Sequence, residues 1–298
     1  MKYWFYLFVL TGIVFTSCKG KETETETTGT TKMLVDESVT PIIEDELVVF
    51  ENIYKQAKIS ASYDTENNVI RDFLADSARI AILTRNLRPD EAKIIQNRKL
   101  LIHVNRFAID AIALVVNKST ADTLITVQEL IDILQGRTSR RQLVFDNANS
   151  STVRYLMELA EVKQLPQKGV YALNSNQEVI KYVHNNLGSI GVIGFNWIKQ
   201  PPVELEGIVA ELKLMRVKNL PGKPGSDKYY IPNQDNLAQE QYPLSRNVYI
   251  INCQAGGGLG LGFASFLAGE VGQRVVLKSG LMPDSIPTRE ILIRKNKE

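Results

Sequence analysis

The sequence predicts an α/β protein with mainly parallel strand pairing. Segments typical of strands and segments typical of helices alternate along most of the 298 residues, which is the pattern of a sheet covered by crossover helices. No internal repeat of solenoid length is present, and the chain after residue 31 is long enough for one large domain or two moderate ones. The formal net charge is only +2, from 35 basic and 33 acidic residues, so the sequence does not indicate a nucleic-acid partner.

The first 18 residues predict a lipoprotein signal peptide. Lys2 precedes an almost wholly apolar run at 4–15, which is shorter than the ~20 residues that a membrane-spanning helix needs. Small residues then lead to Cys18, where a bacterial lipobox has its acylated cysteine. We expect Cys18 to carry lipid and residues 19–31, which contain no apolar side chain, to form a flexible tether. The alternative is a plain signal peptide that contains a cysteine. The sequence leaves open whether the protein faces the periplasm or the outside of the cell.

The first part of the body is expected to form one sheet with its covering helices. Strands are predicted at 32–35, 57–63 and 79–83, and helices at 41–55, 67–76 and 89–97. The run 106–117 is apolar and rich in β-branched residues. It is long enough to pass from one sub-domain into another.

The second part of the body continues the alternation. Helices are predicted at 126–134, 152–162, 177–185 and 259–267, strands at 188–194, 247–251 and 291–293, and an extended loop at 217–236. The glycine-rich stretch 256–262 lacks the Lys-Ser/Thr ending of a P-loop. We therefore expect a flexible loop there that enters its helix at Phe263.

A short strand at 144–146 runs into small polar residues that open a helix. Asn149, Ser150 and Ser151 precede Thr152, so the segment can cap the helix and still present free N–H groups and hydroxyls. The helix dipole favours negative charge at that end, which suits a small anion such as phosphate or sulfate. An ordinary capped helix is the alternative.

Several segments, in the same order along the chain, resemble bacterial phosphate-binding lipoproteins of the PstS-like, type II periplasmic binding protein group. They are 35–41, 107–117, 124–136, 150–152, 188–191, 242–246 and 272–283. The resemblance implies a two-lobe type II periplasmic binding protein fold with mixed, mainly parallel sheets and two hinge crossings. Lobe 1 would take residues 32–112 and 245–298, and lobe 2 would take residues 113–244, with the ligand clamped between them.

The resemblance also implies where the ligand binds. The family's phosphate-contacting Ser-Gly-Thr element aligns with Ser150, Ser151 and Thr152, and either of two arginines would supply fixed positive charge. Two more places are expected to face the cleft, one before the first helix and one at the carboxyl end of the third strand. The full predicted set is Ser38, Val39, Thr40, Thr84, Arg85, Asn149, Ser150, Ser151, Thr152 and Arg154.

Two departures from the family pattern leave the anion's identity open. Asp146 stands where the family usually has an arginine, and Ser151 replaces the glycine. Asp36 and Glu37 also lie near the expected anion site. A carboxylate there repels a dianion unless it accepts a proton from the ligand or pairs with an arginine.

The sequence favours a binding protein over an enzyme. His103 and His184 are far apart in the sequence, and neither lies beside a candidate nucleophile. The sequence contains no Gly-x-Ser-x-Gly elbow. Cys253 is expected to be a buried thiol at the end of a strand. We expect a monomeric, lipid-anchored protein, without metal or cofactor, that captures phosphate or a related oxyanion for an ABC permease. The alternatives are a scaffold or surface interaction lipoprotein of the same fold that has lost phosphate binding, and an anion-responsive regulator of transport.

Overall fold

The structure is a computed structural model that describes residues 24–285. The predicted signal peptide, the lipidation site Cys18 and the strand predicted at 291–293 lie outside the described residues. Within 24–285, no helix combines the length and the apolar character needed to cross a bilayer.

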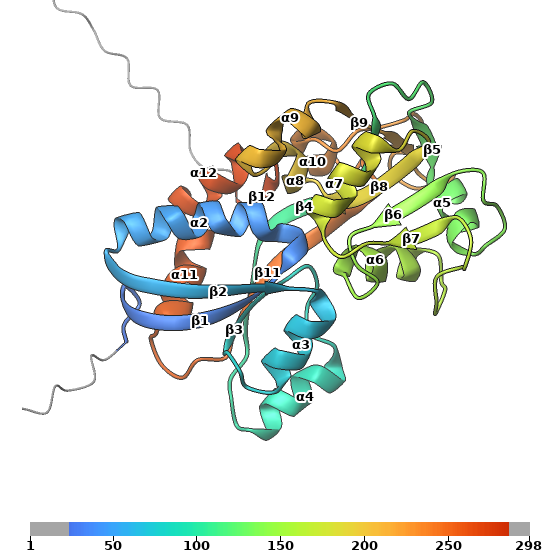
Figure 1. Ribbon diagram of the computed structural model, residues 1–298. Coiled ribbons are helices and arrows are strands. Elements are labelled where there is room, and N and C mark those ends of the chain that lie inside the picture. The colour runs from blue at the N-terminus through green and yellow to red at the C-terminus, as the bar shows by residue number, and fades with distance from the viewer. Residues whose placement is uncertain (1–23, 286–298) are drawn as a thin grey trace, which may run out of the picture.

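The first sheet is covered by helices on both faces (Figure 1). Its elements are β1 (Thr28–Asp36), η2 (Glu37–Val39), α2 (Thr40–Ile53), β2 (Gln56–Asp64), α3 (Glu66–Leu74), β3 (Ile80–Leu83) and α4 (Pro89–Asn97). β1 pairs in parallel with β2 and β3. Ile80 and Ile82 pack toward α2, whereas Ala81 and Leu83 pack toward α3 and α4. Burial on both faces explains why this strand reads as a continuous apolar run.

The other half of the molecule contains the rest of the same sheet and a separate two-stranded sheet formed by 124–126 and 216–218. Its elements are β5 (Leu124–Thr126), α5 (Val127–Leu134), β6 (Gln142–Phe145), α6 (Ser151–Leu159), β7 (Val170–Ala172), α7 (Asn176–Asn185), β8 (Ser189–Gly194), α8 (Asn196–Lys199), η3 (Val203–Leu205), α9 (Glu206–Val209), β9 (Leu212–Leu214), β10 (Arg216–Lys218) and α10 (Gln234–Ala238). A capping box starts α5, because Thr126 Oγ1 accepts from Glu129 N at 3.1 Å and Glu129 Oε2 accepts from Thr126 N at 2.8 Å. The loop predicted at 217–236 is therefore shorter than expected, because β10 includes its first residues and α10 its last ones.

Two strands join the halves. β4 (His103–Asn117) contributes Phe107 and Ala108 to the first core, the apolar side chains of 33–108 and 248–281. It contributes Ala111 to Val116 to the second core, the apolar side chains of 111–244. The chain returns through β11 (Ser245–Asn252), which pairs antiparallel with β4 and β3. The strand order is β2-β1-β3-β11-β4-β8-β6-β7, so parallel pairs occupy both ends and antiparallel pairs the middle. The lobe boundaries at 112 and 244 stay a prediction, because they concern movement.

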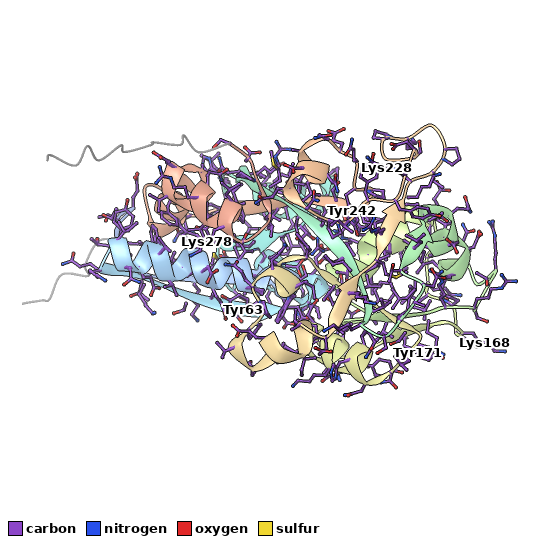
Figure 2. The ribbon with its side chains drawn as sticks, turned by 90° about the horizontal axis from the view of Figure 1, so that it is seen from above. Tyr63, Lys168, Tyr171, Lys228, Tyr242 and Lys278 are labelled. Carbon is purple, nitrogen blue, oxygen red and sulfur yellow. The ribbon has the colours of Figure 1, made fainter. Side chains whose placement is uncertain are left out.

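Tyr242 anchors the return crossing in the middle part of the molecule, whereas Lys168 and Tyr171 lie at one end (Figure 2). The ring of Tyr242 is buried, and its hydroxyl donates to Ile112 O at 2.8 Å. This bond links the two crossing segments to each other just where they leave the second core.

The chain after β11 forms α11 (Leu259–Ala268), α12 (Glu270–Lys278) and β12 (Met282–Pro283). The helix predicted at 259–267 is confirmed, whereas the loop expected to enter it at Phe263 is shorter, because the helix begins at Leu259. The glycines at its start allow close packing. A Cβ on Gly262 would lie 1.8 Å from Glu26 O, and one on Gly260 would lie 2.5 Å from Gln254 Oε1.

The expected tether is corrected at its C-terminal end. Residues 28–31 belong to β1, and each of them pairs with a residue of β2. Glu24 Oε1 also accepts from Gln254 Nε2 and from Leu259 N, both at 2.9 Å. These residues need no apolar side chain to be ordered, since β-branched threonines suit a strand whose backbone hydrogen bonds are satisfied by its neighbour.

Glu46, on α2, gives the fold a measurable pH dependence. Its side chain is fully buried, and neither carboxyl oxygen has a hydrogen-bond partner among the described residues. Burial, with a smaller contribution from Asp45, raises its pKa to about 9. The folded state therefore keeps a proton that the unfolded state loses at a pKa of about 4.3, and stability falls by about 1.4 kcal/mol per pH unit between these values.

We expect Glu46→Gln to remove this slope, because the amide stays neutral at every pH. Urea unfolding at pH 5, 7 and 9 should show the variant gaining stability over the parent as pH rises. Glu206→Gln, at an exposed position on α9, is the matched control and should keep the parental slope. Parallel pH curves for the parent and Glu46→Gln would contradict the prediction.

Candidate functional site

A buried arginine at the centre of the molecule reaches residues of both halves. Arg246, on β11, is 5% exposed, and its Nε and Nη2 donate to Asp110 Oδ2 at 3.0 and 2.8 Å. Its Nη1 donates to Ser151 Oγ at 2.9 Å, and its Nη2 donates to Ser38 Oγ at 3.0 Å. The planar guanidinium can make all four bonds because its donors diverge in a rigid fork. One side chain thus joins hydroxyls from opposite sides of the molecule.

Each of the two serines lies at the start of a helix. Ser38 is in η2, which leads directly into α2, and its N–H donates to Asp36 Oδ1 at 3.0 Å. Ser151 begins α6, whose N-cap is Ser150, with Val153 N donating to Ser150 Oγ at 3.3 Å. The two Oγ atoms are 3.0 Å apart. Since the first N–H groups of α6 have no acceptor within the helix, this point combines amide, hydroxyl and guanidinium donors, which suits an oxyanion.

Carboxyl groups outnumber the cations in this cluster. Asp36, Asp110 and Asp146 are all fully buried. Burial raises the pKa of all three, and the charge of Arg246 acts against that rise at Asp36 and Asp110. Burial and then the neighbouring aspartates also raise the pKa of Glu37 to about 8. At neutral pH, Glu37 therefore keeps a proton that an ordinary glutamate would have lost.

Three buried oxygens around the cluster are acceptors without a donor. Asp110 Oδ1, Asn176 Oδ1 and Asn196 Oδ1 have no hydrogen-bond partner among the described residues. The amide nitrogens of both asparagines are already used, since Asn176 Nδ2 donates to Asp146 Oδ2 at 3.2 Å and Asn196 Nδ2 donates to Ser38 O at 2.9 Å. A ligand that brings its own protons would fit such a site better than a fully deprotonated one.

Comparison with known families decides which group the chain is part of. A PBP superfamily domain matches residues 20–271. The chain belongs to the PBP superfamily. Comparison with curated protein sequences gave no match.

Solved structures share the PBP fold over most of the chain. A protein of Clostridium perfringens described as a phosphate ABC transporter substrate-binding protein, with bound phosphate, superposes with a TM-score of 0.70 at 18% identity, covering 86% of this chain and 100% of that one. An ABC-type phosphate transport receptor from Vibrio cholerae gives 0.63 at 20% identity, covering 85% and 99%. A possible phosphate-binding protein from Planctomyces limnophilus gives 0.57 at 20% identity, covering 86% and 93%.

In this PBP superfamily member the polar turn before α6 lies at the junction of the halves, where Ser151 Oγ meets Ser38 Oγ, and its other two hydroxyls are bonded to a carboxyl group. Ser150 Oγ and Thr152 Oγ1 donate to Asp146 Oδ1 at 2.6 and 2.5 Å. Each hydroxyl has one proton, so neither can also donate to an anion while Asp146 accepts it. Of the three predicted hydroxyls in this turn, Ser151 alone contacts the arginine. Ser150 and Thr152 hold Asp146 in this structure, and their contact with a ligand stays a prediction.

The two arginines predicted as ligand-binding cations are already paired. Arg85 donates to Glu66 Oε1 at 3.0 Å and to both oxygens of Glu91 at 2.8 Å. Arg154 donates to Glu66 Oε1 at 2.6 Å and to Glu158 Oε2 at 2.9 Å. Their positive charge is neutralised by these carboxylates, and their contact with a ligand stays a prediction. Arg246 is the arginine that contacts hydroxyls of both halves.

The other predicted site residues surround the cluster in different ways. Thr84 Oγ1 lies 3.3 Å from Asp36 Oδ2. Thr40 Oγ1 donates to Glu37 O at 2.8 Å, and Val39 buries its side chain in the first core, so a ligand could meet only its backbone. Asn149 is exposed and accepts from Asn67 Nδ2 at 3.3 Å.

Sequence reasoning missed Arg246, although a signal was present. Arg246 stands two positions from an apolar residue on either side, Leu244 and Val248, and Asp110 stands inside the apolar run 106–117. A charged residue of each sign within two buried strands indicates an internal ion pair, because an unpaired charge is almost never fully buried.

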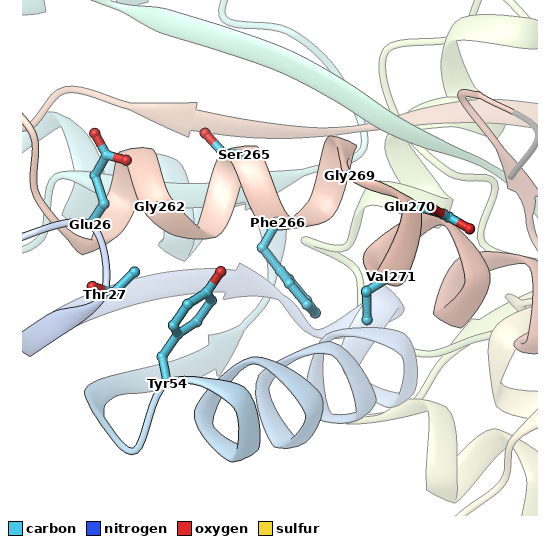
Figure 3. Close-up of a pocket in the computed structure, with 9 residues that line it drawn as sticks. All are labelled: Glu26, Thr27, Tyr54, Gly262, Ser265, Phe266, Gly269, Glu270 and Val271. Atoms are coloured by element: carbon cyan, nitrogen blue, oxygen red, sulfur yellow. The ribbon is translucent and has the colours of Figure 1, made fainter.

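A cavity elsewhere in the molecule is unrelated to this cluster (Figure 3). It measures about 270 Å³ and lies between the start of β1, the end of α2 and helices α11 and α12, with Tyr54 and Phe266 among its lining residues. Within 24–285, no group of three or more His, Cys, Asp or Glu side chains is arranged to hold a metal ion.

Proposed function

We propose that this protein is the solute-binding component of an ABC importer and that it captures inorganic phosphate, or a closely related oxyanion, at the Arg246 cluster. The observation that carries the proposal is the contact of one buried guanidinium with Ser38 Oγ and Ser151 Oγ, which come from opposite halves. A ligand placed between these hydroxyls would be bound by both halves at once, and such contacts stabilise a closed state.

The ligand would enter by replacing the bond between the two serines. Ser38 Oγ and Ser151 Oγ are now 3.0 Å apart. An oxyanion between them would receive both hydroxyl protons, the N–H groups that begin α6, and charge-assisted bonds from Arg246. The surrounding acceptors, Asp36 foremost, would take the protons that a phosphate or arsenate ion still carries near neutral pH.

Calorimetric titration of the full chain, purified in detergent and dialysed free of phosphate, tests the proposal. We expect phosphate and arsenate to bind with micromolar affinity or tighter. Ser151→Ala and Ser38→Ala should each weaken binding by about tenfold or more, since a hydrogen bond to a charged group contributes about 1.5–3 kcal/mol. Ser60→Ala, at an exposed position on β2, is the control and should bind as the parent does. The absence of binding heat for every oxyanion would overturn the proposal.

The same reasoning places the protein in the bacterial envelope. The predicted lipobox at Cys18, together with a body that captures a small solute, supports a lipid-anchored receptor on the periplasmic face or the outer surface, which passes its ligand to permease subunits. We propose binding without catalysis, and the chain's two histidines support this, because His103 is exposed, His184 is half-buried, and neither has a hydrogen bond to Ser38 or Ser151 within residues 24–285.

One observation favours a second candidate, a scaffold or interaction lipoprotein of the same fold. Asp146 stands at the family's arginine position and already occupies the hydroxyls of Ser150 and Thr152. A cluster that satisfies itself in this way could hold the halves together without a solute. The titration above separates the two functions.

A further inference from the structure

A second polar contact joins the two halves beside the ligand site, and its centre is a buried carboxylate. Glu66 begins α3, in the first half, and its side chain is 0% exposed. Arg154 lies on α6, whose Val153 and Leu156 pack in the second core. Arg154 Nε donates to Glu66 Oε1 at 2.6 Å. This ion pair therefore spans the junction between the halves.

Glu66 has both of its arginine partners only when Arg154 is in place. Within the first half, Arg85 is shared between two carboxylates, Glu66 at 3.0 Å and Glu91 at 2.8 Å. These three groups sum to one negative charge, and Arg154, which also pairs with the exposed Glu158, supplies the second cation that Glu66 contacts. If the halves separated, Glu66 would keep half of an arginine's charge while still partly buried, and an incompletely paired carboxylate is unfavourable there.

The pair is also connected to the proposed ligand site through hydrogen bonds. Thr84 Oγ1 lies 3.5 Å from Glu66 Oε2 and 3.3 Å from Asp36 Oδ2. Asp36 in turn accepts from the N–H of Ser38, whose hydroxyl contacts Arg246. Because Thr84 has a single hydroxyl proton, it can satisfy Asp36 or Glu66 at one time, so the state of one carboxylate affects the other.

Neighbouring contacts at the same junction are weaker. Asn67 N donates to Asn149 O at 3.4 Å, a long bond. Arg88 Nη2 and Glu158 Oε1 are 3.7 Å apart, and both side chains are more than half exposed. Exposed pairs of this kind contribute little. The buried Arg154–Glu66 pair is thus the strongest of these three contacts.

We propose that the Arg154–Glu66 ion pair is a closure latch, in which Arg154 acts as a positioning residue that holds the halves together and slows ligand release. The proposal rests on the proposed function. It gives Arg154 a role that needs no contact with the ligand, in place of the ligand contact that its position suggested. The latch acts on dissociation because the pair forms only after the halves have met.

The test measures release and capture of radiolabelled phosphate by the full chain in detergent. Arg154→Met should speed release by about tenfold or more and leave the association rate nearly unchanged, because truncating one partner of a buried, hydrogen-bonded charge pair acts on dissociation. Arg154→Lys should restore part of the slow release. Glu66→Gln combined with Arg154→Met should be less harmful than the sum of the two single changes. Arg88→Met is the matched control and should release phosphate at the parental rate.

A release rate in Arg154→Met equal to that of the parent, or an effect confined to association, would overturn the latch. Small-angle scattering without ligand distinguishes failure of the latch from failure of the proposed function, because it does not depend on phosphate binding. If the parent binds no phosphate, the proposed function fails and scattering alone decides the latch. A larger radius of gyration in Arg154→Met than in the parent and in Arg88→Met would then support it, and equal radii would overturn it.

Discussion

Replacing Arg246 with methionine should destabilise the protein by about 3–5 kcal/mol, because it leaves buried carboxylates without their cation. Asp110 receives two of the arginine's hydrogen bonds, and Asp36 and Asp146 also interact with its charge. The guanidinium resists deprotonation, since these carboxylates raise the pKa of Arg246 against the opposing effect of burial. Urea unfolding at pH 7 measures the loss in free energy.

Two further variants make this result interpretable. Arg106→Met removes an exposed arginine of β4 that pairs with Asp284, and we expect it to change stability by less than about 1 kcal/mol. Adding Asp110→Asn to Arg246→Met should recover part of the loss, because the orphaned charge is removed with its partner. Arg246→Lys should remain folded but bind phosphate weakly, since an ammonium cannot reach both serines. Equal unfolding midpoints for Arg246→Met and Arg106→Met would contradict this account.

Asp146→Asn should strengthen the binding of oxyanions that carry no proton, sulfate above all. The parent presents a buried carboxylate whose pKa is raised by burial and lowered by the bonds from Ser150 and Thr152. An asparagine there removes a negative charge close to the anion, which we expect to raise sulfate affinity by about tenfold or more. Titration of the parent and the variant with sulfate and with phosphate measures the change.

The pH dependence of binding provides the second readout for Asp146. In the parent, each phosphate oxygen that faces a carboxylate needs a proton between them. Because burial raises the pKa of Asp36 and Asp146, that proton is present at low pH and is lost as pH rises, so phosphate affinity should fall with increasing pH. Asp146→Asn should flatten this fall, whereas Asp132→Asn, on α5, should not. Unchanged sulfate affinity and an unchanged pH profile in Asp146→Asn would show that Asp146 has no influence on the ligand.

Local sequence signals identified most of the secondary structure, because each was tied to burial or capping. The apolar run 79–83 and the capped segment 126–134 are examples, and both appear as β3 and α5 with nearly the predicted bounds. The errors fall where packing between distant segments overrides local preference. Gln254 and Glu26 approach the helix at Gly260 and Gly262 so closely that no side chain would fit there, and residues 28–31 form a strand because β2 lies alongside.

The candidate site was predictable only in part. Ser38 and Ser151 belong to segments whose polar residues precede helices, and that pattern is visible in the sequence. Which hydroxyl donates to which acceptor is not visible there. Ser150, Ser151 and Thr152 have similar side chains, yet two of them donate to Asp146 and the other contacts Arg246. The difference arises from the direction in which each side chain leaves the first turn of α6.

The sequence by itself determined the alternation of strands and helices, the order of the family's segments, and the presence of a polar turn that opens a helix. These features depend on neighbours within a few residues, which the chain carries with it. Tertiary structure alone decided the charge balance of the site. Arg246 meets Asp110 across 136 positions, Ser151 across 95 and Ser38 across 208. Only the pairing of β11 with β4, and the meeting of the two halves around it, brings those groups within hydrogen-bond distance.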